Sequence, residues 1–186
     1  MGWKDIFGKK KKEKDGSIHL DDLILSNLKM GWFLDYDMQT WEVEAYNYYD
    51  WGGGAITKEW LLKSIDDAIY LARDDDDEVE WSVNRQIKVN RLGPGIIEHI
   101  AKHDDPPDDI TYDGTVYHLE ESSGGHFYKN GKGPGQKFLS WDFEDDTGTK
   151  FLAIEQWGEK DYEASTGISV EEYQFDNILP KGDGLV

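Results

Sequence analysis

The chain contains no cysteine among its 186 residues, so disulfides, zinc–thiolate sites and thiol catalysis are excluded. Long hydrophobic runs are also missing. No stretch of about 18 apolar residues occurs, and the sequence therefore predicts no membrane-spanning helix. No apolar segment follows Met1, so we expect no secretory signal and a cytoplasmic location.

Basic residues are scarce relative to acidic ones. The sequence has 20 Lys and Arg against 39 Asp and Glu, which gives a formal net charge of -19. A protein with so little positive charge has nothing broad with which to neutralise phosphates, so nucleic acid is excluded as a general partner. Aromatic residues are abundant, with eight Trp, ten Tyr and seven Phe, which argues against disorder along the whole chain.

The charge is unevenly distributed along the chain. Residues 1–16 carry six lysines and three acids, a charge of +3, so the other 170 residues carry -22. Such a segment suits an anionic membrane surface, where each Lys contributes roughly 1 kcal/mol, or a protein partner. A solvated tail that aids solubility is the alternative. The predicted docking residues are the apolar and basic side chains of this segment: Trp3, Ile6, Phe7, Lys9, Lys10, Lys11 and Lys12.

The hydrophobic pattern predicts a mainly β protein with one short helix. Trp41, Val43 and Ala45 alternate with acids at a period of two, which is typical of a strand. Asp113-Gly114 is a hairpin-turn signal. Residues 94–103 place three isoleucines at helical spacing. We therefore expect two small, similar antiparallel β halves joined by this helix.

The two halves share an order of elements. At an offset of 81 residues Trp60 aligns with Trp141 and Leu71 with Leu152, which predicts a duplication. The expected segments follow from this division: a basic amphipathic tail over 1–17, a first β half over 18–103, an acidic Pro-Pro connector over 104–109, a second β half over 110–180 and a C-terminal tail over 181–186.

Two histidines have metal-ligand spacing. His99 and His103 lie four residues apart on the predicted helix, with Asp104 and Asp105 beyond them. The His-Glu-x-x-His motif of zinc proteases is missing, and histidines in a last helical turn also complement the helix dipole. We therefore predict no bound metal and no other cofactor, and keep a metal-dependent hydrolase using His99 and His103 as an alternative.

Other familiar site patterns fail on inspection. Asp142, Glu144 and Asp146 alternate as calcium ligands do, but Thr147 and Ala153 stand where a calcium loop needs Gly and Glu. Alternating acids on the wet face of a strand explain them better. The Gly-rich segment 131–137 lacks the Gly-Lys-Ser/Thr ending of a phosphate-binding loop. With no nucleophile elbow either, the sequence favours a protein without enzymatic activity.

Two clusters combine aromatic rings with carboxylates, a combination that attracts organic cations such as polyamines. Sugars also bind to aromatic platforms with polar neighbours. Ordinary cross-strand aromatic pairing, with the acids facing water, is the alternative explanation. The candidate ligand-binding residues come from both clusters: Trp41, Glu44, Trp51, Glu155, Trp157, Glu159 and Tyr162.

One stretch of the second half is distinctive. Residues 151–159, Phe-Leu-Ala-Ile-Glu-Gln-Trp-Gly-Glu, and later Asp161-Tyr-Glu-Ala164 resemble the bacterial domain-of-unknown-function family 4178. Trp41-Glu-Val43 and the segment 76–81 are similar to that family's first half, so the resemblance covers roughly residues 20–180. The family has no assigned activity, and no catalytic residue is carried over. The resemblance implies a context near phage-shock-type membrane-stress proteins and polyamine aminopropyltransferases.

The leading hypothesis is an interaction or adaptor module of a bacterial cell, recruited to the inner face of a membrane or to a membrane protein by residues 1–14. Its expected partner is a protein, for example membrane-stress machinery, with peripheral contact to anionic lipid. The first alternative is a binding module for a cationic small molecule such as a polyamine, and the second is the hydrolase. The sequence predicts no oligomeric state.

Overall fold

The computed structural model describes residues 20–75 and 78–182. Strands dominate this part of the chain, and the prediction of a mainly β protein is confirmed. The strands are β1 (Phe33–Tyr36), β2 (Gln39–Gly52), β3 (Ala55–Lys63), β4 (Ala68–Asp74), β5 (Glu80–Ile87), β6 (Asp109–Tyr112), β7 (Thr115–Tyr128), β8 (Gln136–Asp145), β9 (Lys150–Gly158), β10 (Asp161–Val170) and β11 (Phe175–Leu179). The helical elements are α1 (Ile96–His103) and the 3₁₀ turns η1 (Leu20–Asp22), η2 (Leu25–Asn27), η3 (Val89–Leu92), η4 (Lys129–Gly131) and η5 (Glu172–Gln174).

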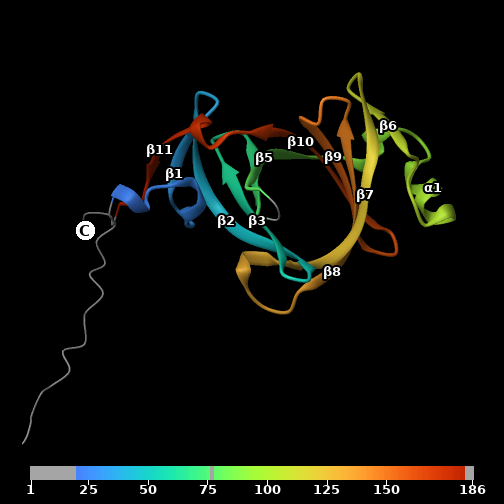
Figure 1. The fold of residues 1–186 in the computed structure, drawn as a ribbon, viewed down its shortest axis with the longest axis horizontal. Helices are drawn as coiled ribbons and strands as arrows, with labels where there is room; N and C mark the ends of the chain where they lie inside the picture. The colour runs from blue at the N-terminus through green and yellow to red at the C-terminus, as the bar shows by residue number, and fades with distance from the viewer. Residues whose placement is uncertain (1–19, 76–77, 183–186) are drawn as a thin grey trace, which may run out of the picture.

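The strands form one antiparallel sheet that closes on itself (Figure 1). Their order is β11-β1-β2-β3-β4-β5-β10-β9-β8-β7-β6, and β2 also pairs with β7, so the eight strands from β2 to β7 make a ring. Three residue pairs form the closing seam, with Tyr49 opposite Phe127 at its centre. Beside that pair the rings of Tyr48 and Tyr128 stack with centroids 4.5 Å apart.

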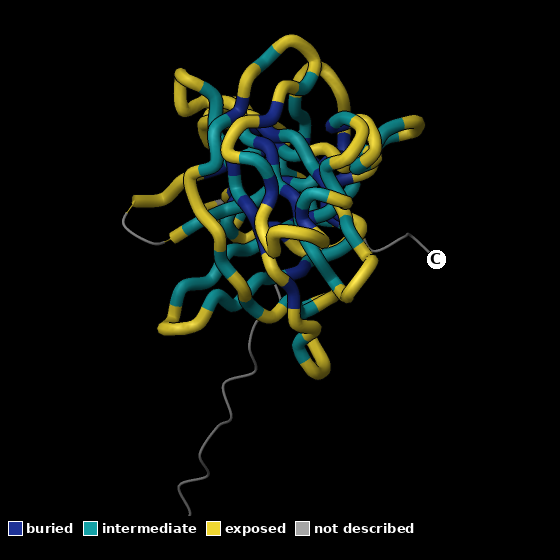
Figure 2. The backbone as a smooth tube through the Cα atoms, turned by 90° about the vertical axis from the view of Figure 1, so that its right-hand side faces the viewer, coloured by how far each residue is buried: buried dark blue, intermediate teal, exposed yellow. Residues whose placement is uncertain are grey.

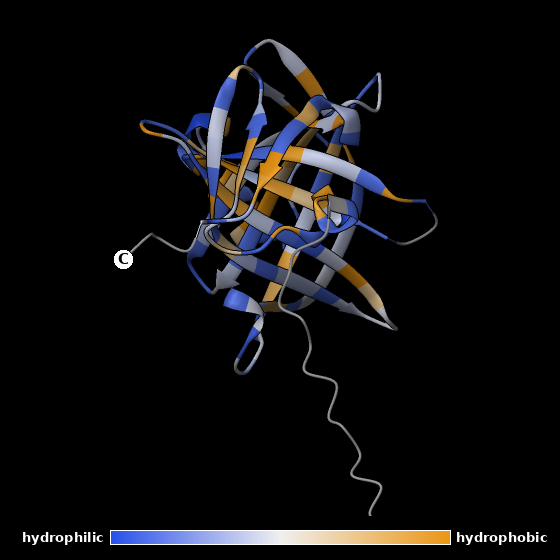
Figure 3. Cartoon of the chain, turned by 90° about the vertical axis from the view of Figure 1, so that its left-hand side faces the viewer, coloured by the Kyte–Doolittle hydropathy of each residue, from blue (hydrophilic) through white to orange (hydrophobic). Residues whose placement is uncertain are grey.

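The hydrophobic cores lie outside the ring. The first covers the outer face of β2 to β5, where side chains such as Trp60 and Leu71 are buried under η2, β1 and β11. Leu34 of β1 and Phe175 of β11 belong to this cover. Trp60 Nε1 donates a hydrogen bond of 3.2 Å to the Leu28 carbonyl, which satisfies the buried indole. Hydrophobic and hydrophilic residues alternate along these strands (Figure 3).

A second core covers the outer face of β7 to β10. Trp141, Phe143 and Ile154 pack there against Leu92 of η3 and Ile100 of α1. In Figure 2 the buried residues lie along the middle of the strands, whereas the turns that join them are exposed. Both cores lie on the outer face of the ring strands. The side chains on the inner face belong to neither core and face the interior of the ring.

The two halves have the same strand order. The strands β1 to β5 and β6 to β10 each form a meander, and the ring joins them through β2–β7 and β5–β10. Trp60 on β3 and Trp141 on β8 are both buried in an outer core. The duplication itself stays a prediction. The connector 104–109 contacts the second core, because Asp105 accepts a hydrogen bond of 2.8 Å from Trp141 Nε1.

The local predictions agree with the structure where turn chemistry is strong. The Asp113-Gly114 turn joins β6 to β7, and both residues have positive φ, as a tight hairpin requires. The predicted helix begins at Ile96 rather than at residue 94, after Gly95 in a left-handed conformation. In the described ranges, no helix combines the length and the apolar character needed to cross a membrane.

Closure at the seam needs a residue without a side chain at Gly125. A Cβ at this position would lie 2.6 Å from the Asp50 carbonyl oxygen across the seam. We expect Gly125→Ala to lower the free energy of unfolding by about 1–3 kcal/mol, measured by urea denaturation. Gly158→Ala, where a Cβ would meet Asp161 at an ordinary 3.8 Å, is the control and should change it by less than about 1 kcal/mol. Equal stability of both variants would contradict the steric role of the seam.

Candidate functional site

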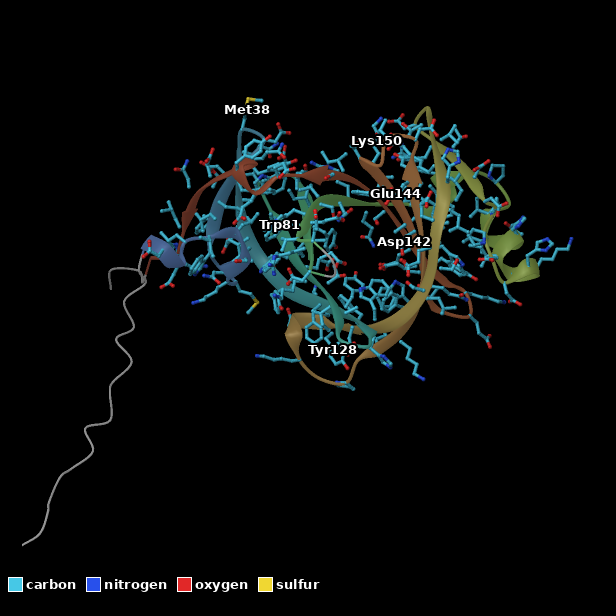
Figure 4. All side chains as sticks on the ribbon, viewed as in Figure 1. Met38, Trp81, Tyr128, Asp142, Glu144 and Lys150 are labelled. Carbon is cyan, nitrogen blue, oxygen red and sulfur yellow. The ribbon has the colours of Figure 1, made fainter. Side chains whose placement is uncertain are left out.

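The inward-facing side chains of the ring line an open cavity of about 730 Å³. All eight ring strands contribute residues to its wall. Figure 4 shows Asp142 and Glu144 of β8 pointing into this interior. The cavity is therefore a property of ring closure and not of any single strand or loop.

The wall of the cavity is strongly acidic. Ten carboxyl side chains line it, against one lysine, Lys129, among the described residues. The acids come from seven of the eight ring strands: Glu59, Asp74, Glu80, Glu120, Glu121, Asp142, Glu144, Glu155, Asp161 and Glu163. Five of these residues, among them Glu59, Asp142 and Glu155, are partly buried, and like charges at such positions repel each other and favour protonation or a bound cation.

Glu59 is held at the centre of a hydrogen-bonded group. Asn47 Nδ2 donates to Glu59 Oε1 at 2.9 Å, and the Tyr49 hydroxyl donates to Glu59 Oε2 at 3.4 Å. The Asn47 Oδ1 atom accepts a hydrogen bond of 2.9 Å from the backbone N–H of Asn130. Because both ends of this buried amide are engaged, the loop after β7 fixes the orientation in which Asn47 meets the carboxyl group.

Glu59 and Glu155 both have strongly raised pKa values. Burial is the main cause for Glu59, with the charge of Glu163 adding to it against the two hydrogen bonds, and the result is a pKa of about 7. Burial and the charges of Glu59, Glu163 and Asp142 raise the pKa of Glu155 to about 8. Glu155 also lies directly opposite Glu163 in the β9–β10 pairing. Glu59 and Glu155 therefore gain and lose protons near neutral pH.

The acidic wall continues along β8. Burial, together with the charge of Glu121, raises the pKa of Asp142 to about 6, although the Ser140 hydroxyl donates to Asp142 Oδ1 at 3.0 Å. Burial and the charges of Glu120 and Glu80 raise the pKa of Glu144. Electrostatic coupling thus runs from β3 through β9 and β10 to β8 and β7, which makes the carboxyls a connected series.

One part of the wall is aromatic. Tyr49 stacks on Trp51 with ring centroids 5.8 Å apart, and Trp157 contacts Phe127 at 5.4 Å and Phe138 at 5.1 Å. Tyr49 belongs both to this aromatic wall and to the hydrogen-bonded group around Glu59. The cavity therefore offers aromatic faces immediately beside carboxyl groups, the arrangement that binds organic cations.

The structure brings together three of the predicted ligand-binding residues. Trp51, Glu155 and Trp157 all line the cavity, although they come from different halves of the sequence. Trp41 does not. Its ring is 1% exposed in the first outer core, and its Nε1 donates to the Tyr36 carbonyl, because the face of β2 that carries it points outward.

The other predicted residues of this kind lie away from the cavity wall. Glu44 is exposed at a bulge of β2 and pairs with Lys63 at 3.5 Å. Glu159 is exposed in the turn between β9 and β10. Tyr162 packs against the second outer core. These three belong to the surface or to packing, and the aromatic-acid clusters read from the sequence therefore divide between interior and exterior.

The remaining predicted sites are the N-terminal docking residues and the two histidines of α1. The docking residues Trp3, Ile6, Phe7 and Lys9 to Lys12 lie outside the described residues, and their role stays a prediction. His99 and His103 follow each other on α1 with ring centroids 4.5 Å apart. Across residues 20–75 and 78–182, no group of three or more His, Cys, Asp or Glu could hold a metal ion.

Glu59 lies in neither aromatic-acid cluster of the sequence, whereas Tyr49 and Glu163 lie within the clusters but are not among the candidate ligand-binding residues. Asp142 and Glu144 were noted only as acids on the wet face of a strand. In the structure this face lines the cavity inside the ring and not the outer surface of the protein. The signal that could have found the site is the alternation of acids with apolar residues on β8 and at the start of β10, since a closed sheet with apolar cover outside must place the acids inside.

This fold and cavity define a class: a closed antiparallel β protein with an acidic, partly aromatic interior. A family model described as "Domain of unknown function (DUF4178)" matches residues 29–172, and the chain belongs to this family. The expected resemblance is confirmed. The chain is also similar to a protein described as "Uncharacterized protein" from Aquifex aeolicus (strain VF5), 29% identical over 178 residues that cover 96% of both chains. No solved structure matches.

The raised pKa values predict how stability depends on pH. Glu59 and Glu155 hold protons in the folded chain at pH values where the unfolded chain has lost them, so stability falls as pH rises from about 4.5 to 8. We expect Glu155→Gln to remove part of this slope and to raise the free energy of unfolding at pH 8 by at least about 1 kcal/mol. Urea titrations at pH 5 and pH 8 measure this.

The exposed Glu159 supplies a matched control for this experiment. Glu159→Gln removes the same charge from the outside of the fold and should leave the pH slope of the free energy of unfolding unchanged. A wild-type stability that rises between pH 5 and pH 8 would contradict the protonation of the interior pair.

Proposed function

We propose that this protein binds an organic cation with several amino groups, of the polyamine type, inside the ring. The observation that carries the proposal is the composition of the cavity wall. Among the described residues it has ten carboxyls, a single lysine and aromatic faces beside the carboxyls. A volume of about 730 Å³ is in the range of small-molecule sites, which run from about 300 to 1,000 Å³.

The spread of the carboxyls favours a ligand with more than one positive charge. A single ammonium group neutralises the acids it touches, whereas the coupled series runs from Glu59 past Glu155 to Asp142 and beyond. An extended chain with amino groups separated by methylene groups meets several of these carboxyls at once. Its methylene groups pack on Trp51, Phe127 and Trp157, which carry no charge.

The adaptor role predicted from the sequence is compatible with this proposal but rests on different residues. A membrane or protein contact would be made by residues 1–14, which lie outside the described residues. A cation-binding module that is peripheral to the inner face of a membrane would combine both roles. The interior of the ring supports the ligand-binding part, and we therefore place it first.

Calorimetric titration of the full chain with spermidine tests the proposal. We expect saturable binding, because the ammonium groups of spermidine displace protons from the interior carboxyls and relieve the repulsion between the carboxylates. Glu155→Gln should weaken the affinity about tenfold, since a hydrogen bond to a charged group is worth about 1.5–3 kcal/mol. Trp157→Ala should weaken it about threefold through the lost aromatic face.

Glu44→Gln is the matched control, because Glu44 is an exposed acid on a ring strand that does not line the cavity. It should leave the affinity for spermidine unchanged. An affinity that is millimolar or weaker and unaffected by Trp157→Ala would overturn the proposal.

The pH dependence of binding provides an independent check. A bound ammonium group stabilises the carboxylate form, so binding releases protons from groups with pKa values of about 6, 7 and 8. The affinity for spermidine should therefore rise from pH 6 to pH 8. Titrations in two buffers of different ionisation enthalpy count the released protons. Proton uptake, or no proton exchange at pH 7, would show that the interior carboxyls are not the ligands.

A further inference from the structure

We propose that the chain's own N-terminal segment, residues 1–14, occupies the acidic cavity in competition with the cationic ligand. This inference rests on the proposed cation site and adds its regulation. Two matched properties carry it. The segment combines lysines with the apolar residues Trp3, Ile6 and Phe7, and the cavity combines carboxyls with aromatic faces.

The charges are complementary in sign and in spread. The four consecutive lysines from Lys9 to Lys12 present several ammonium groups along one chain, as a polyamine does. Ten carboxyls from seven of the eight ring strands line the cavity, so several of them can meet several ammonium groups at once. Exposed acids on the outer surface bind these lysines weakly, because an exposed ion pair contributes at most about 1 kcal/mol.

The aromatic wall extends the match beyond charge. Tyr49, Trp51, Phe127 and Trp157 lie beside the carboxyls, not at a distance from them. Trp3, Ile6 and Phe7 precede the lysines by only a few residues. One short segment therefore carries apolar and basic side chains close together, as the cavity wall carries aromatic and acidic ones. A polybasic segment without apolar residues would match only half of this wall.

The segment is long enough to reach the ring. Seven residues lie between Lys12 and Leu20, where the described chain begins, and the eight Cα–Cα steps of an extended chain span up to about 28 Å. A compact chain of this size has a radius of gyration of about 16 Å. Leu25 of η2 packs in the first outer core, directly on the strands β2 to β5 whose inner face lines the cavity. The described chain therefore begins beside the outer side of these strands, and the length of the segment sets how far around the ring its lysines can extend.

The first arm of the test measures spermidine affinity in the full chain. Replacing Lys9, Lys10, Lys11 and Lys12 together by Gln should raise the affinity two- to tenfold at low salt, because the internal competitor is weakened. Replacing the same four lysines by Arg keeps the charge and should leave the affinity near that of the wild type. The difference between the two variants should vanish at high salt, where charge attraction is screened.

The second arm does not depend on spermidine. A carbodiimide reagent joins lysine amines directly to carboxyls that touch them, and mass spectrometry identifies the pairs. We expect links from the segment Lys9–Lys12 to cavity carboxyls such as Glu80, Glu120 and Glu144, which line the wall. Mixing isotopically light and heavy protein should show that the links form within one chain.

The two arms separate the possible failures. If links reach the cavity but spermidine binds neither variant, the proposed function fails and the N-terminal segment is the occupant of the cavity. If spermidine binds to wild type and to the Gln variant with equal affinity, and the links reach only outer acids such as Glu98 or Asp113, the competition is overturned while the cation site stands. Links formed only between light and heavy chains would also overturn it.

Discussion

The short pairing between β2 and β7 is the constraint on which the rest of the structure depends. Three residue pairs convert an open sheet of eleven strands into a ring. Without this seam the inner face would be an ordinary wet surface, and its acids would be hydrated separately. With it, the same acids face each other across a confined space. The interior pKa values of about 6 to 8 are the electrostatic consequence of that confinement.

Bulges in the two longest strands make closure compatible with two outer cores. The register of β2 shifts between Val43 and Ala45, and that of β7 shifts between Leu119 and Glu121. Trp41 and Val43 before the first bulge are buried in the outer core, whereas Asn47 and Tyr49 after it line the cavity. A single extra residue therefore turns the odd-numbered side chains from the outer face to the inner face.

These bulges explain how far the sequence could predict the structure. Period-two patterning and the Asp-Gly turn are local, and they correctly predicted the mainly β fold, most strands and the β6–β7 hairpin. Trp41 and Trp51 lie on one strand at the same parity, so the pattern assigned both to one cluster. In the structure the bulge separates them, with Trp41 in a core and Trp51 in the cavity. Ring closure is equally invisible locally, because it joins residues 48–50 to residues 126–128.

The interior resolves a conflict between stability and binding. Ionised carboxylates at the buried positions of this wall, Glu59, Asp142 and Glu155, would oppose folding, since an isolated buried carboxylate is costly. The raised pKa values of Glu59 and Glu155 reduce this cost, because protons neutralise these two carboxyls in part near neutral pH. The outer cores then hold the ring against the remaining repulsion. In the proposed complex, ammonium groups displace those protons, so Glu59 and Glu155 change from neutral groups to anionic ligands. In this proposal the charge of the interior depends on its occupant, whereas a surface cluster of equally many acids in bulk water stays ionised.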